Sequence, residues 1–466
     1  MNTPQHVAVI DIGKTNAKVA LVDVAGRREV AVRRQPNRVI GGPPYPHYDT
    51  DRLWAFILTG LTDLHAAHGV DALVVTTHGA AAALVDAAGK LAAPVLDYEW
   101  IGPNALARDY DCVRPPFSET GSARLPMGLN IGAQLFWQFN AFPEIRRRTE
   151  TIVTYPQYWV LRLTGTAVNE ATSLGCHTDL WRPRDGRFST LVEQQGWLQL
   201  MAPVAKAYDV IGPVLPQIAA TTKLAADTPV ICGIHDSNAS LYAHLAWRTP
   251  PFAVVSTGTW VISMAVGGSP VTLDPELDTL LNVNALGDPV PTARFMGGRE
   301  FDRLMAGSIA GCTADDIGSV LRHQAMLLPS VESHSGPFPG RHHSWSVDQS
   351  ALSDGRRYAV VSFYLALMTA AGLVMTGAAG EILVEGPFAD NQPYLDMLAS
   401  ASGLPVFAAT GTGTSIGAAL LAIPREGAGP ATRHLPGHVP QQAMANYAAR
   451  WRACVTACAR QGAGYR

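Results

Sequence analysis

The sequence predicts an α/β protein of two related domains, and three observations support this prediction. The chain has 466 residues, enough for two or three domains with sizeable hydrophobic cores. Residues 7–22 read as a strand, a turn of glycine and polar residues and a second strand, and the same order recurs at residues 252–266. Strands and helices also alternate toward the end of the chain. With a Pro-containing linker at residues 248–252, we expect domains over 1–248 and 249–466 that face each other across a central cleft.

The composition is that of an ordinary globular protein, with 47% hydrophobic and 16% charged residues. The 35 Lys and Arg residues nearly balance the 38 Asp and Glu residues, so no nucleic-acid or membrane partner is expected. We expect no apolar run long enough to cross a bilayer and no signal peptide, which favours a cytoplasmic protein. The six cysteines form no Cys-x-x-Cys pair, which favours free thiols.

The first turn combines a carboxylate with small and polar residues. It follows the apolar strand 7–10 and consists of Asp11, Ile12, Gly13, Lys14, Thr15 and Asn16. We expect a positive φ angle at Gly13, so that amide N–H groups converge and bind phosphate together with the side chains of Thr15 and Asn16. Asp11 would hold a metal ion through water. A hairpin without a ligand is the alternative. A P-loop is excluded because Ala8 replaces its first glycine and a strand follows the turn.

Polar side chains also follow two further extended segments. A strand over residues 70–77 ends at His78 and Gly79, and a run over residues 91–96 ends at Asp97 and Glu99. We expect His78, Asp97 and Glu99 to lie at neighbouring strand ends and to bind the hydroxyl groups of a polyol. The alternative for His78 is a core histidine that is hydrogen-bonded to the backbone.

The middle of the first half is predicted to be mainly helical. An amphipathic helix begins near residues 49–51, and residues 131–165 read as helical with breaks at two prolines. A polar turn over residues 169–175 follows, and residues 190–228 read as helical or irregular.

The strongest chemical signal lies in residues 229–240. A buried strand over residues 229–234 ends at His235 and Asp236, and a helix follows at residues 241–247. Where a strand gives way to a helix, side chains point into the crevice at the carboxyl edge of the sheet, and N–H groups of the first helical turn lie there. A carboxylate at this place suits a general base that meets a bound hydroxyl. The alternative is that Asp236 is only the N-cap of the helix.

The second half repeats the opening turn with Gly258 and Thr259. A long apolar helix, two strands and two shorter helices follow, with polar and glycine-containing turns at residues 386–391 and 410–415. Such turns allow the base and ribose of a nucleotide to lie close to the backbone.

Five of these stretches resemble motifs of the FGGY family of carbohydrate kinases, in the family's order and over essentially the full chain. They are VIDIGKTNAK at residues 9–18, YWVLRLTG at 158–165, GIHD at 233–236, VSTGTW at 255–260 and GTGTSIGAAL at 411–420. The resemblance implies two domains of the actin/hexokinase-like (ribonuclease H-like) fold, with ATP, Mg²⁺ and a sugar bound in the cleft between them.

The resemblance also implies roles for the candidate residues. Asp236 would be the catalytic base, and Asp11 would lie beside Mg²⁺. The phosphate groups would be bound by Gly13, Lys14, Thr15, Asn16, Gly258 and Thr259. Adenosine would be bound by Gly386, Asn391, Gly411, Thr412 and Ser415. The sugar would be bound by His78, Gly79, Asp97, Glu99, His235 and Asp236. Two features depart from the family pattern: Pro387 and Phe388 follow Gly386 in place of further glycines, and Lys14 stands where many relatives have a small residue.

The reaction that the resemblance implies is ATP-dependent phosphorylation of a terminal hydroxyl of a neutral ketose. The motifs look most similar to those of L-fuculokinases and L-rhamnulokinases, which favours a deoxyketose, and a xylulokinase- or ribulokinase-type pentulose kinase is the runner-up. Two other classes are alternatives: a phosphatase of the same superfold, which would need a positioned water, and a sugar-responsive actin-like regulator, which would lack the base. A homodimer is compatible with the resemblance.

Overall fold

The structure is a computed structural model that describes residues 3–308, 311–409, 413–424, 432–433 and 441–462. The chain forms two compact units. The first contains residues 1–248, 281–289 and 411–430, and the second contains residues 249–280, 290–410 and 431–466. The sequence did not indicate that two segments of the second half pack with the first unit.

The first unit is organised around a mixed sheet with the strand order β13-β14-β6-β1-β2-β3, in which β15 also pairs with β6. Its strands are β1 (His6–Ile12), β2 (Asn16–Asp23), β3 (Arg28–Pro36), β6 (Ala72–Thr77), β13 (Val210–Pro213), β14 (Pro229–Ile231) and β15 (Ile234–His235). The strands β1, β2 and β3 form an antiparallel meander, and β6 runs parallel to β1. Because β1, β6 and β15 run in one direction, their carboxyl ends at Ile12, Thr77 and His235 meet at one edge of the sheet.

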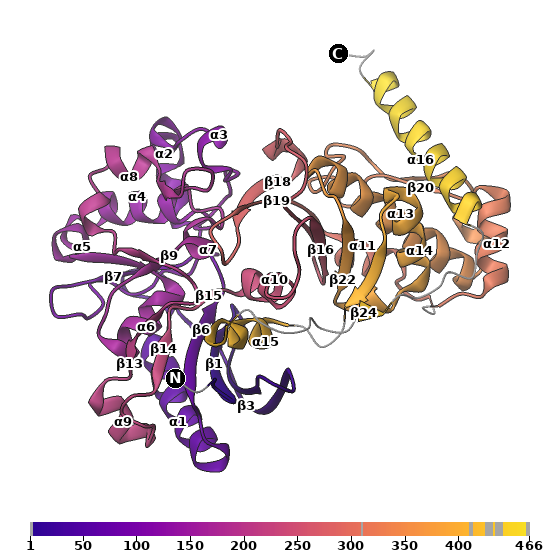
Figure 1. Ribbon diagram of the computed structural model, residues 1–466. Coiled ribbons are helices and arrows are strands. Elements are labelled where there is room, and N and C mark those ends of the chain that lie inside the picture. Colours follow the sequence, from indigo (N-terminus) through magenta and orange to yellow (C-terminus); the bar gives the residue numbers. More distant parts are fainter. Residues whose placement is uncertain (1–2, 309–310, 410–412, 425–431, 434–440, 463–466) are drawn as a thin grey trace. The chain divides into compact units, whose positions relative to one another are not determined.

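Helices cover this sheet (Figure 1). They are α1 (Thr50–His68), α6 (Tyr155–Thr164), α10 (Asp236–Leu245) and α15 (Thr414–Ala419). Asp49 caps α1, and the apolar stripe of α1 packs with α6 against Ala8, Ile10 and Ile12 of β1. The helices α10 and α15 contact β6 and β1 from the other side.

Smaller elements fill the long connection between β6 and β14. They are β7 (Ala82–Val85), α2 (Ala107–Val113), α3 (Phe117–Thr120), α4 (Ile131–Ala141), α5 (Pro143–Arg148), β8 (Thr151–Thr154), β9 (Asn169–Glu170), α7 (Ala171–Leu174), α8 (Thr190–Gln194), β12 (Val204–Ala205) and α9 (Pro216–Thr222). The strand β8 interrupts the stretch predicted to be helical, since its β-branched residues favour a strand and pair with β7.

The predicted strand over residues 91–96 is wrong. β7 and β8 form a separate two-stranded sheet, and residues 91–96 contribute only isolated bridges at Leu91 and Leu96. Asp97 therefore does not end a strand of the main sheet. Its N–H donates to the carbonyl oxygen of Pro46, which places it in a turn beside β5 (His47–Tyr48).

The strand predicted over residues 229–234 is broken at Gly233. This glycine has a φ angle of +82°, and a Cβ atom there would lie 2.2 Å from the carbonyl oxygen of Val75 in β6. The backbone reaches β6 this closely only because residue 233 has no side chain. Beyond the break, β15 pairs with β6 and places His235 opposite Thr77.

The second unit repeats the plan of the first, with the strand order β18-β19-β17-β16-β22-β23-β24. The strands of this sheet are β16 (Phe252–Thr257), β17 (Val261–Val266), β18 (Thr279–Val283), β19 (Pro289–Phe295), β22 (Glu381–Glu385), β23 (Val406–Ala409) and β24 (Thr432–Arg433). Residues 281–283 of β18 and Pro289 of β19 are among the residues grouped with the first unit. β16 and β17 form an antiparallel hairpin, and β22 runs parallel to β16, just as β6 runs parallel to β1. The predicted repeat of strand, turn and strand is confirmed.

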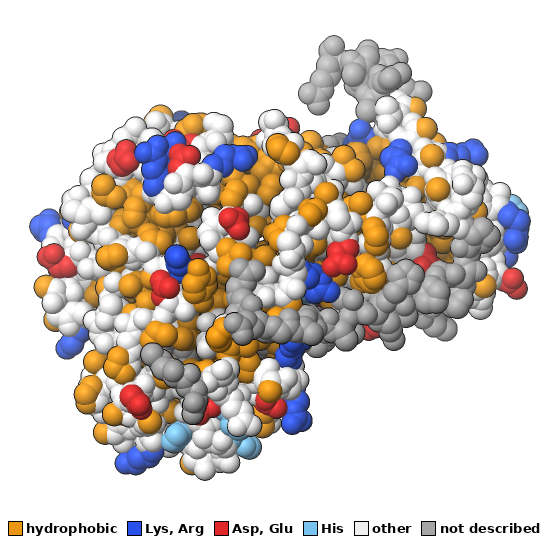
Figure 2. Space-filling view, in the orientation of Figure 1, with side chains coloured by type: hydrophobic (Ala, Val, Ile, Leu, Met, Phe, Trp, Pro, Cys, Tyr) orange, Lys and Arg blue, Asp and Glu red, His pale blue; other side chains and the backbone are white. Residues whose placement is uncertain are grey.

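The surface carries charges of both signs. In Figure 2, Lys and Arg side chains are interspersed with Asp and Glu side chains over the face in view. This agrees with the near balance of 35 basic and 38 acidic residues in the sequence.

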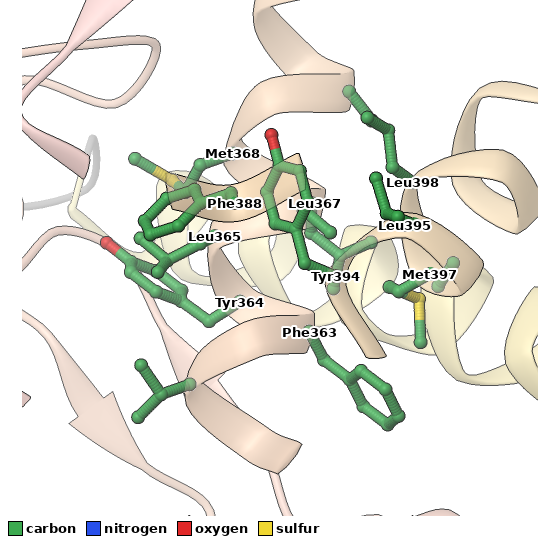
Figure 3. Close-up of a cluster of buried hydrophobic side chains, with 14 of the residues drawn as sticks. Phe363, Tyr364, Leu365, Leu367, Met368, Phe388, Tyr394, Leu395, Met397 and Leu398 are labelled. Carbon is green, nitrogen blue, oxygen red and sulfur yellow. The ribbon is translucent and has the colours of Figure 1, made fainter. Parts of the chain in front are cut away.

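The core of the second unit forms mainly between α13 (Asp354–Met375) and α14 (Gln392–Ser402), with α11 (Gly297–Leu304), α12 (Ala314–His323) and α16 (Gln441–Gly462) around them. Figure 3 shows part of this cluster: Phe363, Tyr364, Leu365, Leu367, Met368, Phe388, Tyr394, Leu395, Met397 and Leu398. The expectation that no apolar run could cross a bilayer needs correction, since α13 is long and apolar enough to do so. However, 78% of its apolar stretch is buried in the fold, as expected of a core helix.

We expect Gly233→Ala to lower the melting temperature far more than Gly89→Ala. Both glycines have positive φ angles, +82° and +73°, so both substitutions carry a left-handed strain of about 1–2 kcal/mol. Only at Gly233 would the new Cβ also overlap a backbone atom, because nothing lies within 4 Å of it at Gly89. Thermal unfolding of both variants measures the difference. Equal losses would mean that β14 and β15 do not depend on this close approach.

Candidate active site

Asp236 is the first residue of α10 and directly follows β15. The N-cap of this helix is His235, so the alternative that Asp236 is the N-cap is wrong. Oδ1 of Asp236 accepts hydrogen bonds from the N–H (2.6 Å) and the hydroxyl (3.3 Å) of Ser237. The side chain is 30% exposed and can therefore meet a ligand. Burial raises the pKa of Asp236, while the nearby His78 and the bonds from Ser237 lower it.

The ring of His235 packs against this carboxylate. Its Nε2 lies 3.2 Å from Oδ1 of Asp236, and its Nδ1 lies 3.3 Å from Nδ2 of Asn238. Because an amide NH₂ group only donates, Nδ1 accepts this bond and Nε2 carries the proton that faces Asp236. Burial lowers the pKa of His235 to about 4, so the ring is neutral near pH 7. Gly79 leaves room for it, since a Cβ there would lie 2.9 Å from Nε2 and 3.2 Å from Sγ of Cys176.

His78 is enclosed by the rings of Tyr48, Tyr98 and Tyr155, whose centroids lie 5.0, 5.3 and 5.2 Å away. Its Nδ1 lies 2.7 Å from the carbonyl oxygen of Gly79, which only accepts, so Nδ1 carries the proton. Burial lowers the pKa of His78 to about 4. Nε2 of this neutral ring is therefore an acceptor, and it is buried without a hydrogen-bond partner in the described part of the chain.

The ammonium of Lys14 binds the carboxylates of Asp97 and Glu99. Nζ lies 3.2 Å from Oε2 of Glu99, in direct contact with Oδ1 of Asp97, and 5.2 and 4.8 Å from the ring centroids of Tyr48 and Tyr98. The three charged residues thus lie together, but the sequence had grouped Lys14 with the phosphate turn. The pairing was not visible in the sequence, because 83 positions separate Lys14 from Asp97.

Asp11 lies near the carboxyl end of β1, where Nζ of Lys18 is 3.4 Å from its Oδ2 and 3.1 Å from Oε1 of Glu29. Burial raises the pKa of Asp11 to about 6; Lys18 lowers it, and the charges of Asp236 and Glu29 raise it. Among the described residues, no group of three or more His, Cys, Asp or Glu side chains could hold a metal ion. A Mg²⁺ ion that binds with nucleotide phosphates needs only one or two carboxylates and water. Asp11 fits such an ion, because the charges of Asp236 and Glu29 act on it as those of nearby carboxylates.

The first turn is closed by hydrogen bonds to its own backbone. The Gly13 N–H donates to the Asn16 carbonyl oxygen, and the N–H and amide of Asn37 donate to the carbonyl oxygens of Thr15 and Gly13, each at 2.9 Å. The predicted positive φ angle at Gly13 is wrong. Glycine is favoured there because a Cβ would lie only 3.1 Å from the Asn16 oxygen. Asn37, which is buried just after β3, was not among the residues predicted from the sequence.

The second turn is also closed by a backbone hydrogen bond, from the Gly258 N–H to the Trp260 carbonyl oxygen at 2.9 Å, which spans two residues instead of the three spanned in the first turn. Gly298 packs directly on this turn, since a Cβ there would lie 1.9 Å from the Gly258 oxygen. Gly386 has a φ angle of +81°, and a Cβ there would lie 2.0 Å from the Thr257 oxygen. Two glycines from other elements therefore support the second turn by close backbone contact.

A cavity of about 430 Å³ opens beside the second turn, within the second unit. It is lined by Gly258, Thr259, Gly298, Phe301, Asp302, Tyr358, Pro387, Phe388, Asp390 and Asn391. Phe301 lies 6.0 Å from the ring of Tyr358 and 5.7 Å from that of Phe388. Asn391 is the N-cap of α14, and its amide also donates to the Ser362 hydroxyl. The sequence missed Phe301 and Tyr358, because apolar residues at helical spacing look the same in a core and in a binding cavity.

The residues predicted to bind adenosine are divided between the units. Gly386 and Asn391 belong to the second unit, and Ser415 to the first. Ser415 lies in α15, which packs so closely on α10 that a Cβ at Gly417 would lie 1.8 Å from the Ala239 carbonyl oxygen. Gly411 and Thr412 lie outside the described residues.

Comparisons with known proteins agree with this architecture. The model of the N-terminal domain of the FGGY family of carbohydrate kinases matches residues 6–243, and the model of the C-terminal domain of carbohydrate kinase FGGY matches residues 249–431. The crystal structure of a carbohydrate kinase from Novosphingobium aromaticivorans is 36% identical, with a TM-score of 0.89 over 98% of this chain and 99% of that chain. A ligand-bound xylulose kinase from Lactobacillus acidophilus is similar in fold, with 14% identity and a TM-score of 0.80 over 99% of both chains.

A curated L-fuculokinase from Salmonella typhi is 25% identical over 270 residues, which are 56% of this chain and 57% of that protein. The match therefore spans little more than half the length of this relative. The expected two-domain α/β fold of the actin/hexokinase-like type is confirmed by the full-length structural matches. Kinases of this type are phosphotransferases that use ATP. The chain belongs to the FGGY family of carbohydrate kinases.

Proposed function

We propose that this protein transfers the γ-phosphoryl group of ATP to a terminal hydroxyl of a neutral ketose, with Asp236 as the general base. The observation that carries the proposal is the position of Asp236: a partly exposed carboxylate on the first turn of α10, at the carboxyl edge of the sheet. A deoxyketose similar to L-fuculose or L-rhamnulose is the preferred substrate, since an L-fuculokinase is among the relatives. A pentulose such as xylulose is the second candidate, because xylulose kinases share the fold.

The base is prepared by its neighbours. Oδ1 of Asp236 is held by Ser237 and faces the Nε2 proton of His235, which leaves Oδ2 to accept the proton of the sugar hydroxyl. As that oxygen attacks the γ-phosphorus, the bond from phosphorus to the bridging oxygen of ADP breaks, and the hydroxyl proton moves to Asp236. Burial raises the pKa of Asp236 by more than His78 and Ser237 lower it, and this raised pKa makes the ionised carboxylate a better proton acceptor.

The sugar would meet an acceptor at His78 and a charged group at Lys14. The unpartnered Nε2 of His78 suits a sugar hydroxyl, because a hydroxyl both donates and accepts. We assign Lys14 to the sugar site together with Asp97 and Glu99, since both carboxylates bind its ammonium. With Asp236, this group has three carboxylates and one ammonium, and the excess negative charge would repel sugar acids.

The nucleotide would be bound by the two turns and by the cavity in the second unit. We assign its phosphates to the backbone of the two turns, at Gly13, Thr15, Asn16, Gly258 and Thr259. The cavity beside the second turn suits the adenosine, because aromatic rings can stack on the base and Asp302 can accept from ribose hydroxyls. Asp11 would hold Mg²⁺, which supplies positive charge beside the phosphate groups.

Two other functions would give different results in an assay of ATP turnover with and without sugar. A phosphatase-like hydrolase would release phosphate from ATP without a sugar, and a non-catalytic sugar-responsive regulator would show no turnover at all. The presence of a carboxylate at position 236 speaks against the regulator. A cytoplasmic location, the absence of nucleic-acid or membrane partners and a homodimer stay predictions.

We expect Asp236→Asn to reduce kcat by about a hundred- to ten-thousandfold while the fold and ATP binding persist. The same variant should be more stable than the wild type at neutral pH. The folded pKa of Asp236 is raised, so ionisation costs stability above this pKa, and the cost disappears as the pH falls below the pKa of the unfolded chain. Melting curves across pH and a coupled ADP assay measure both effects. A variant with wild-type kcat would contradict the assignment of the base.

The pH dependence of wild-type kcat should show an acid limb above the ordinary range of an Asp carboxyl. Activity requires ionised Asp236, so kcat should fall as the pH drops through its raised pKa. His78 and His235 stay neutral down to about pH 4, so they should not add a limb near pH 6.5. Rates at saturating sugar and ATP across pH test this. An acid limb at the ordinary carboxyl pKa would contradict the raised pKa of Asp236.

Substrate choice should depend on His78 and on the carboxylates. We expect His78→Phe, which keeps a ring among the three tyrosines, to lower kcat/KM for the best ketose by about tenfold or more while KM for ATP stays within about twofold. The panel contains L-fuculose, L-rhamnulose, xylulose, ribulose, glycerol and gluconate.

Asp97→Asn should raise the rate with gluconate relative to the rates with neutral sugars, because it removes one negative charge. If glycerol or gluconate leads the wild-type panel, the sugar site is misassigned.

A methyl group at Gly258 in the second turn should leave the stability of the fold unchanged but weaken the binding of ATP. A Cβ at Gly258 would lie 3.9 Å from its nearest neighbour, so Gly258→Ala should melt like the wild type. If phosphate approaches this backbone, the methyl group should raise KM for ATP by about tenfold, with little change for the sugar. Gly318→Ala in α12 is the control. Unchanged KM for ATP in Gly258→Ala would remove this turn from the phosphate site.

A further inference from the structure

A buried network of hydrogen bonds connects Glu170 and Thr172 to His235, the residue before Asp236. The proposed reaction does not use this network. The Glu170 carboxylate accepts hydrogen bonds from the N–H of Thr172 (2.9 Å), the N–H of Ser173 (3.2 Å) and the hydroxyl of Thr172 (2.5 Å). The same Thr172 oxygen accepts a bond from the backbone N–H of His235 at 3.1 Å. Glu170 is 1% exposed and Thr172 is fully buried. One hydroxyl therefore connects Glu170 to the residue that precedes Asp236.

Glu170 fixes the direction of that hydroxyl. An ionised carboxylate only accepts hydrogen bonds, so Thr172 donates its proton to Glu170 and turns its lone pairs toward the His235 N–H. Burial raises the pKa of Glu170 to about 7, and the three donors lower it. Near pH 8 the carboxylate is therefore ionised and the hydroxyl is oriented. Without this acceptor the His235 N–H would be a buried donor without a partner.

A second arm of the network holds the residues before the break in the strand. Nε2 of Gln157 donates to the carbonyl oxygen of Cys232 at 2.9 Å, and its Oε1 accepts from the Thr154 hydroxyl at 2.5 Å. Asn169 accepts from the Thr154 N–H at 2.7 Å. Side chains from neighbouring elements thus hold the strand on both sides of Gly233, where regular pairing with β6 is interrupted.

We propose that Glu170 and Thr172 are positioning residues for phosphoryl transfer: Glu170 orients the Thr172 hydroxyl, which fixes the backbone at His235 and thereby directs the Asp236 carboxylate. The inference rests on the proposed role of Asp236 as the base. The simpler interpretation is that Glu170 only caps α7, for which the bonds from two backbone N–H groups suffice. The hydroxyl that reaches His235 is not part of that cap, so the two interpretations can be separated at Thr172.

The test compares Thr172→Val with Thr172→Ser near pH 8. Valine keeps the shape of threonine and both N–H bonds of the cap but removes the hydroxyl, whereas serine keeps the hydroxyl. We expect Thr172→Val to lower kcat by about tenfold or more, with KM for ATP and sugar within about twofold, because a displaced base costs rate rather than binding. Thr172→Ser should keep kcat within about threefold. Glu170→Gln should also lower kcat, since either orientation of its amide turns an N–H group toward a backbone N–H.

Thr178→Val is the matched control. Thr178 is 1% exposed, and its hydroxyl oxygen also accepts a backbone N–H, from Leu180 at 3.1 Å, while it donates to the Leu174 carbonyl oxygen. Removal of the Thr178 hydroxyl should destabilise the unit about as much as removal of the Thr172 hydroxyl. It should leave the hydrogen bond to the His235 N–H in place. We expect Thr178→Val to keep wild-type kcat. The proposal would be overturned if Thr178→Val lowered kcat as much as Thr172→Val does. It would also be overturned if Thr172→Val kept the wild-type kcat.

Hydrogen–deuterium exchange gives a readout that does not require a known sugar. Thr172→Val should speed exchange in the peptide over residues 230–240, and Thr178→Val should not. If the wild type forms no sugar-dependent ADP across the panel, the proposed function fails, and exchange still decides whether Thr172 holds this segment. Equal protection of residues 230–240 in both variants would overturn the positioning role.

Discussion

The first unit depends on the close approach of the segment 229–235 to β6. The contact is possible because Gly233 brings its backbone against the carbonyl oxygen of Val75, where any side chain would overlap. It interrupts regular pairing, and buried polar groups on α6 and α7 take over the hydrogen bonds that the strand cannot make. The position of α10, and of the carboxylate on its first turn, follows from this contact.

Burial then sets the chemistry of the site. His78 and His235 are kept neutral because burial lowers the pKa of each to about 4. Burial raises the pKa of Asp236, although the nearby His78 and the hydrogen bonds from Ser237 lower it. The site therefore carries a cost in stability that is also the source of its basicity, as is common where function and stability oppose each other. A few hydrogen bonds from Ser237 and His235 keep the carboxylate in one orientation.

The sequence indicated the strand–turn–strand repeat and the position of Asp236, since both follow from local periodicity and turn residues. It misjudged features that depend on distant partners. Gly13 was expected to need a positive φ angle, whereas its constraint is the nearby Asn16 oxygen. Residues 91–96 were expected to form a strand, but β7 pairs with β8, which the sequence assigned to a helical region. Asn37 and Phe301 gave no local signal at all.

The sequence by itself determined the α/β class, the repeated hairpins and the family, because hydrophobic period, glycine turns and motif order are local properties of the chain. Only the tertiary structure decided that Lys14 binds Asp97 and Glu99, that Gly298 and Gly386 support the second turn, and that Glu170 reaches the residue before Asp236. Each of these contacts joins residues far apart in the chain. Their formation depends on packing that brings whole elements together, and no local pattern of residues encodes that packing.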